Sequence, residues 1–144
     1  DKFIGDAIMA MWNAPSEDAF HVDNACRGAL SAFHISEDLN KAFKDNGEPP
    51  MRTRFGLHTC DVLVGNIGAE GGVNYTVIGD TVNVASRLES LGREVDPDAE
   101  VIILASQDIG NNLPADIRYS PLGEQKVKGK DRPVEVIRLT LETR

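Results

Sequence analysis

The stretch "YTVIGDTVNVASRLE", residues Tyr75–Glu89, decides the fold of this chain. Its first four residues, one aromatic and three β-branched, predict a short strand over Tyr75–Ile78. A Gly-Asp turn follows, and helical spacing then predicts a helix from Thr81 to about Leu91 that Gly92 closes. A strand that runs through a turn into an amphipathic helix indicates a fold in which strands and helices pack together.

Polar and apolar residues occupy separate faces of this helix. The apolar face, expected to pack on the core, consists of Val84, Leu88 and Leu91. The polar face, at spacings i, i+4 and i+7, consists of Asn83, Arg87 and Ser90. A planar guanidinium can donate two parallel hydrogen bonds to a phosphate. The alternative is that Asn83 is an ordinary surface residue and that Arg87 pairs with Glu89 or Glu94.

Toward the N-terminus, "KFIGDAIMAMW" predicts a β-hairpin with its turn at Gly5-Asp6. Ser16 is a candidate N-cap for a helix from about Ala19 to Lys44, which Gly47 and the two prolines after it end. Strands are then expected in "MRTRFGLHT" and "VLVGNIG", before a glycine-rich loop at 68–72.

Toward the C-terminus, the pattern predicts a strand at 101–104, a short helix at 106–113 and strands at 117–122 and 134–139. Several strands are joined by short turns, and helices are interspersed among them. The prediction is therefore an α+β domain with a largely antiparallel sheet.

Composition narrows the class of protein. At 144 residues, with 41% hydrophobic and 26% charged residues, the chain is long enough for one core. Its net charge of -8 argues against a broad nucleic-acid-binding surface. No apolar run approaches the roughly 20 residues that span a bilayer, and a cytoplasmic location is expected. Cys26 and Cys60 have no metal or redox spacing and are interpreted as buried free thiols.

Several turns carry groups suited to phosphate and metal. Asp6 follows a glycine at the hairpin turn, and "KVKGK" places Lys126, Lys128 and Lys130 at alternating positions. A carboxylate for metal, cations for phosphate and a flexible backbone together indicate a nucleoside triphosphate site. Neither a Walker A motif nor a G-x-G-x-x-G fingerprint is present in the sequence.

Four blocks, "KFIGDAIMA", "GLHTCDVLVGNIG", "YTVIGDTVNVASRLE" and "VKGKDRPVEVI", resemble successive blocks of the class III nucleotidyl cyclase catalytic domain. They occur in the family's order and cover nearly the whole chain. The resemblance implies a ferredoxin-like, mostly antiparallel sheet with helices packed on it. The family's first block, a strand and loop with one metal aspartate, has no counterpart here. Residues 1–144 are thus expected to be an adenylyl cyclase catalytic domain incomplete at its N-terminus, inactive or poorly folded without its parent.

The resemblance implies a reaction and a metal site. Such enzymes convert a nucleoside triphosphate to the 3′,5′-cyclic monophosphate and pyrophosphate through attack of the ribose 3′-oxygen on the α-phosphorus. Asp6 matches one of two aspartates that hold two ions, Mg²⁺ or Mn²⁺, at each site. Lys128 matches a contact to the β- and γ-phosphates, although either neighbouring lysine could serve instead.

The resemblance also assigns base and ribose contacts. Lys2 and Thr76 match positions that read the purine, and an ammonium with a hydroxyl complements N1 and N6 of adenine. Guanylyl cyclases have Glu and Cys at these positions, so ATP is the expected substrate. Asn83 matches the residue that orients the ribose. Arg87 matches the residue that stabilises charge on the α-phosphate in the transition state.

Family members build each site between two catalytic domains. One domain supplies the metal carboxylates, and the other supplies the base, ribose and arginine groups. Because this chain carries both sets, the resemblance implies a head-to-tail homodimer. Regulatory or sensor domains in the parent protein are further expected partners, and nucleic acid is not.

The second block contains a histidine, His58, and a cysteine, Cys60. Cys60 stands where the family usually has glycine, and His58 matches a family histidine whose role is expected to be structural. Two alternatives to an adenylyl cyclase stay open. One is an inactive nucleotide-binding, dimerising module of the same fold, and the other is a guanylyl cyclase.

Overall fold

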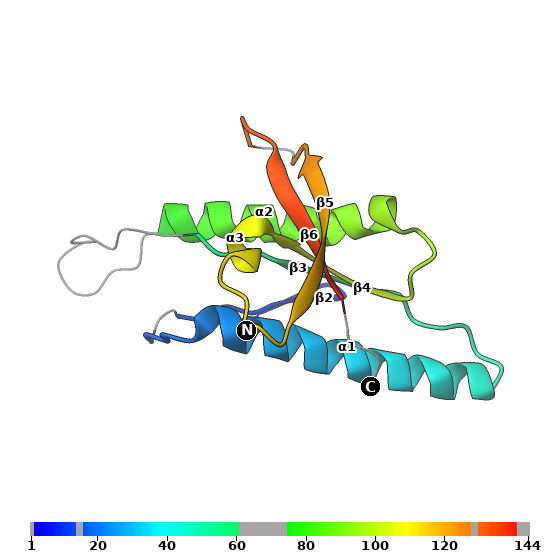
Figure 1. The fold of residues 1–144 in the computed structure, drawn as a ribbon. Helices are drawn as coiled ribbons and strands as arrows, with labels where there is room; N and C mark the ends of the chain where they lie inside the picture. Colours follow the sequence, from blue (N-terminus) through cyan, green and yellow to red (C-terminus); the bar gives the residue numbers. More distant parts are fainter. Residues whose placement is uncertain (1, 14–15, 61–74, 128–129, 141–144) are drawn as a thin grey trace.

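The computed structural model describes residues 2–13, 16–60, 75–127 and 130–140 (Figure 1). Its main feature is a four-stranded sheet in the order β3-β4-β6-β5. The strands are β3 (Thr53–Leu57), β4 (Val101–Ser106), β5 (Arg118–Gln125) and β6 (Val134–Thr140). β3 lies parallel to β4, and the other two pairs are antiparallel. The predicted α+β class and the three C-terminal-half strands are confirmed.

Two helices cover opposite faces of this sheet. These are α1 (His21–Asp45) and α2 (Tyr75–Val95), and Figure 1 shows them on either side of the strands. A third, short helix, α3 (Gln107–Gly110), follows β4 directly and is shorter than predicted. The helix expected over 19–44 is confirmed. It ends at Asp45, with Asn46 as its C-cap, and Gly47 follows with a φ of 75° that suits glycine.

β4 lies at the centre of the core because all six of its residues are buried. Ile103 and Ala105 pack with α1, whereas Ile102 and Leu104 pack with α2, as expected from the alternation of side chains along a strand. A strand covered on both faces reads as a continuous apolar run, "VIILA". The two helices are thus held on one central strand.

The N-terminal hairpin forms a sheet of its own. β1 (Lys2–Ile4) and β2 (Ala7–Met9) pair antiparallel, with Gly5 at φ 61° in the turn. The predicted hairpin at Gly5-Asp6 is therefore confirmed. Ile8 on β2 is 68% exposed, so this hairpin presents apolar surface to solvent within the described chain.

Three further predictions about where helices and strands begin or end were wrong. Residues Tyr75–Ile78 open α2 and do not form a strand, since a short run of Val, Ile, Thr and Tyr is ambiguous when it continues into a helical pattern. α2 also extends past Gly92 to Val95. The N-cap of α1 is Phe20 and not Ser16; the Asp18 carboxylate instead accepts a hydrogen bond from the Phe20 amide at 2.9 Å.

Some expectations fall outside the described residues, namely the strand in "VLVGNIG" and the loop at 68–72. Of the two cysteines, Cys26 is buried as expected, but Cys60, which follows β3, is exposed, so the prediction that both thiols are buried was wrong for Cys60. Among the described helices, none is both long and apolar enough to cross a membrane.

Candidate functional site

α2 lies directly on the backbone of β3. A Cβ atom built on Gly56 would overlap the carbonyl oxygen of Ala85 and lie 2.5 Å from the amide nitrogen of Glu89. Val84 and Leu88 on the same side of α2 are 1% and 0% exposed. Burying a leucine side chain this completely contributes about 2 kcal/mol. The predicted apolar face of α2 is thereby confirmed, and its burial against the sheet leaves the opposite face of the helix exposed to solvent.

The outer face of α2 carries the predicted polar stripe. Asn83, Arg87 and Ser90 are all exposed. Arg87 makes no ion pair within the part of the chain that the structure describes. Glu89, one of its expected partners, instead accepts a hydrogen bond from Arg54 Nε at 3.0 Å. The Arg87–Glu89 alternative is wrong, and among the described residues the exposed Arg87 guanidinium has no acidic partner.

Arg54 is a residue that the sequence analysis missed. It lies on β3, and its partner Glu89 is 35 positions away in the sequence. The only local signal is the alternation in "RTRFGL", which places Arg54 on the same side of the strand as Gly56. That signal cannot identify a partner on a helix so distant in the chain.

Asp6, the predicted metal ligand, lies in the exposed turn between β1 and β2. Within the described residues, no group of three or more His, Cys, Asp or Glu could hold a metal ion. Mg²⁺ commonly takes only one or two protein carboxylates, with phosphate oxygens and water completing its shell. A solvent-facing carboxylate such as Asp6 therefore fits an ion that arrives with a triphosphate.

The structure does not describe the side chains of the remaining predicted residues. Lys2 lies in β1, and Thr76 lies in the first turn of α2 rather than in a strand. Lys128 falls outside the described residues altogether. Their roles in base and phosphate binding stay predictions.

Polar side chains gather at the C-terminal ends of β3 and β4, near the start of α2. His58 Nδ1 lies 2.8 Å from Ser106 Oγ, and Cys60 Sγ lies 3.0 Å from Thr81 Oγ1. Burial lowers the pKa of His58; nearby Lys130 lowers it further, and Asp108 opposes both. These contacts tie the segment after β3 to β4 and to α2.

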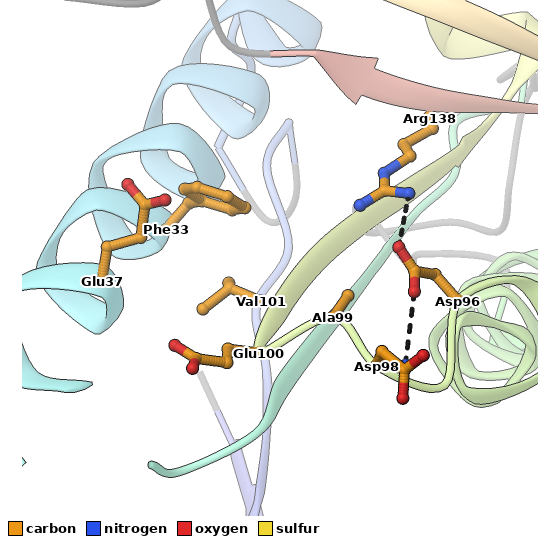
Figure 2. Close-up of a pocket in the computed structure, with 8 residues that line it drawn as sticks. All are labelled: Phe33, Glu37, Asp96, Asp98, Ala99, Glu100, Val101 and Arg138. Carbon is orange, nitrogen blue, oxygen red and sulfur yellow. Dashed lines mark hydrogen bonds and ion pairs between the residues drawn. The ribbon is translucent and has the colours of Figure 1, made fainter. Parts of the chain in front are cut away.

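A cavity of about 510 Å³ opens at the other end of α2 (Figure 2). It lies between α1, the α2–β4 connection and β6, and is lined by Glu37, Asp98, Glu100 and the Asp96–Arg138 ion pair among others. The Arg138 guanidinium at 3.0 Å lowers the pKa of Asp96. None of the predicted site residues lines this cavity.

Comparison with known proteins places these features in a family. Residues 2–139 match the model of the adenylate and guanylate cyclase catalytic domain. The chain is 41% identical over 135 residues to Adenylate cyclase 1 of Rhizobium meliloti, covering 94% of this chain and 20% of that protein. It is 33% identical over 140 residues to Adenylate cyclase of Anabaena cylindrica, covering 94% of this chain and 27% of that one.

Guanylate cyclases are also similar to this chain. The receptor-type guanylate cyclase gcy-23 of Caenorhabditis elegans is 30% identical over 128 residues, covering 88% of this chain and 11% of that protein. Among solved structures, the adenylyl cyclase CyaB from P. aeruginosa matches with a TM-score of 0.75 and 30% identity, covering 100% of this chain and 72% of that one.

The chain thus spans well under half the length of the curated relatives it matches. The family model nevertheless covers all the strands and helices that position the polar stripe, and the fold agrees with that of a solved cyclase. The chain belongs to the adenylate and guanylate cyclase catalytic domain family.

Proposed function

We propose that this chain is the catalytic domain of an adenylyl cyclase, which converts ATP to 3′,5′-cyclic AMP and pyrophosphate. The observation that carries the proposal is the outer face of α2, where Asn83 and Arg87 are exposed and Arg87 has no ion-pair partner within the described chain. An exposed guanidinium beside an amide, on a helix anchored along its opposite face, suits the charge and the ribose of a nucleotide.

The proposed reaction is a single displacement at the α-phosphorus of ATP. The ribose 3′-hydroxyl gives its proton to solvent water as its oxygen bonds to the α-phosphorus, and the bond from the α-phosphorus to the bridging oxygen breaks, with its electron pair leaving on pyrophosphate. Asn83 hydrogen-bonds the ribose and directs the 3′-oxygen. Arg87 stabilises negative charge that grows on the α-phosphate only in the transition state, so it acts on rate more than on affinity.

Asp6 holds the metal in this proposal. Two divalent ions, Mg²⁺ or Mn²⁺, supply Lewis acidity toward the 3′-oxygen and the triphosphate when bound. Lys128 contacts the β- and γ-phosphates, while Lys2 and Thr76 read the adenine. The similarity to adenylate cyclases of two bacteria at 41% and 33% identity supports ATP as the substrate.

The active form we propose is a head-to-tail homodimer. Asp6 would come from one copy, and Asn83 and Arg87 from the other. Support comes from the exposure of both sets of groups in a single copy: the Asp6 turn and the outer face of α2 are open to a partner surface. The exposed apolar side chain of Ile8, beside the Asp6 turn, suits such a contact.

The test is a cyclic-nucleotide assay on the full-length protein, with ATP and GTP in parallel and with Mg²⁺ or Mn²⁺. Arg87→Ala should lower kcat by about 100-fold or more, as loss of a charge-stabilising donor does elsewhere. Arg93→Ala is the matched control, because Arg93 is exposed on another face of the same helix, and its kcat should stay within about twofold.

Each other outcome identifies an alternative. Product from GTP but not ATP would indicate a guanylyl cyclase, a reading that the similarity to guanylate cyclases favours. Nucleotide binding with no product from either substrate would indicate a non-enzymatic nucleotide-binding module. Equal losses in Arg87→Ala and Arg93→Ala would refute the role of the α2 stripe.

A further inference from the structure

The ion pair between β3 and α2 lies beside the polar stripe. Arg54 Nε lies 3.0 Å from Glu89 Oε1, and the two side chains are 26% and 38% exposed. The stem of Arg54 continues along the helix, since a Cβ atom built on Gly92 would lie 3.3 Å from Arg54 Cδ. Glu89 stands two residues after Arg87 on the same helix.

Apart from this ion pair and the Cys60–Thr81 contact nearer the start of α2, the described contacts that hold this helix on the sheet are apolar or made by backbone. Val84 and Leu88 hold the helix on the sheet through apolar burial, which is not directional. Gly56 permits a close approach but supplies no side chain that could choose one rotation. An ion pair that is also a hydrogen bond requires a defined distance and angle. Arg54 and Glu89 therefore restrain the rotation of α2 about its axis.

We infer that Arg54 and Glu89 are positioning residues for Arg87, an inference that rests on the proposed function. Any rotation or slide of α2 that breaks their contact moves the Arg87 guanidinium with it. Because transition-state stabilisation depends on placement, a shift of about 1 Å can lower the rate by up to about 100-fold. The pair acts through Arg87 and does not contact the nucleotide.

The experiment compares kcat and KM for ATP in the full-length protein. Arg54→Gln and Glu89→Gln should each lower kcat by about tenfold or more, while KM changes by less than about threefold. Arg54→Glu combined with Glu89→Arg restores an ion pair of opposite polarity and should recover most of the lost kcat. Arg54→Lys keeps the positive charge but loses the planar guanidinium, so its kcat should fall between that of Arg54→Gln and that of the unsubstituted protein.

The Asp96–Arg138 pair supplies the matched control. It has the same 3.0 Å separation and similar exposure, 34% and 33%, but lies beyond the C-terminal end of α2. Arg138→Gln should leave kcat within about twofold. Thermal unfolding of each variant identifies any that fail to fold. If Arg54→Gln does not fold, Arg54→Lys takes its place in the comparison.

The outcomes separate the two hypotheses. Unchanged kcat in the Arg54 and Glu89 variants, an equal loss in Arg138→Gln, or a reversed pair that recovers nothing would overturn the positioning role. An unsubstituted protein that forms no cyclic nucleotide from ATP would overturn the proposed function, and this inference with it.

Discussion

The imidazole Nδ1 of His58 lies 2.8 Å from the buried hydroxyl of Ser106, and this contact joins the end of β3 to the end of β4. The two residues are 48 positions apart, and they meet because β3 and β4 run parallel in register, with Leu57 opposite Ala105. The contact supports the structural role expected of His58. It also places a titratable group where charging it is unfavourable.

His58 should make stability depend on pH. Burial lowers its folded-state pKa below the unfolded value of 6.5, so between the two values the unfolded chain binds more protons. The free energy of unfolding should therefore fall as pH drops below about 6.5 toward the folded-state pKa. Urea unfolding at pH 7.5 and 5.5 should show a smaller fall for His58→Gln, which can keep a hydrogen bond to Ser106. An identical fall in both proteins would contradict this.

Gly56 should tolerate no side chain. A methyl group there overlaps the backbone of α2 at Ala85, and neither backbone can move aside without disturbing the core. Gly56→Ala should lower the free energy of unfolding by about 3 kcal/mol or more, measured by chemical denaturation. Gly79→Ala is the control, because nothing lies within 4 Å of a Cβ atom on Gly79 in α2. It should be neutral or stabilise by about 0.5 kcal/mol.

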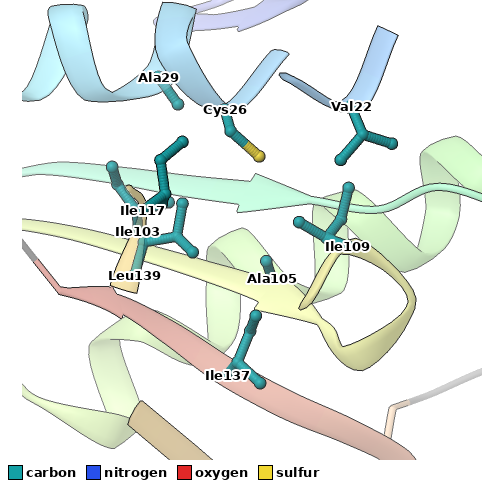
Figure 3. Packing of buried hydrophobic residues seen from close by; sticks show 9 residues of the cluster. All are labelled: Val22, Cys26, Ala29, Ile103, Ala105, Ile109, Ile117, Ile137 and Leu139. Carbon is teal, nitrogen blue, oxygen red and sulfur yellow. The ribbon is translucent and has the colours of Figure 1, made fainter. Parts of the chain in front are cut away.

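The two thiols should differ sharply in reactivity. Cys26 lies within the core formed between α1 and the sheet (Figure 3), and burial, with a smaller contribution from Asp23, raises its pKa to about 11. At pH 8 only about one Cys26 in a thousand is a thiolate. Cys60 is exposed. A thiol reagent followed by peptide mapping should modify Cys60 in the folded protein, and Cys26 only after unfolding. Equal labelling rates would count against this packing.

The shared site predicts complementation between inactive variants. Asp6→Ala and Arg87→Ala should each abolish most activity alone, because every site in either homodimer lacks one group. In a one-to-one mixture about half of the dimers are mixed, and each of these has one intact site. Activity should therefore recover to about a quarter of that of the unsubstituted protein, measured as cyclic AMP formed.

A second pairing is the control for that experiment. Asn83→Ala mixed with Arg87→Ala should show no recovery, since both groups come from the same copy and every site then carries a defect. Recovery in this pairing as well, or in neither pairing, would contradict a site divided between Asp6 on one copy and Arg87 on the other.

Local pattern was enough to predict most of the elements. A few neighbouring residues, through their hydrophobic periodicity or their turn-forming type, were enough to predict the Gly5-Asp6 turn, the long helix α1 and the strands β4, β5 and β6. The two faces of α2 were also predictable, because residues three and four apart share a side of a helix whatever it packs against. The polar stripe at Asn83 and Arg87 was therefore readable from the sequence as a candidate site.

The contacts that give these elements their positions required the tertiary structure. A short apolar run such as Tyr75–Ile78 can form either a strand or a helix, and the neighbouring elements decide which. The burial of Cys60 likewise depends on which elements pack against it, and the local sequence does not specify them. The partners of Arg54 and His58 lie 35 and 48 residues away. Sequence patterns reflect periodicity along one element, whereas sheet order brings distant residues together. The sequence alone thus determined most of the elements and the polar face of α2. Only the packing of α2 on β3 decided that Glu89 pairs with Arg54 and not with Arg87.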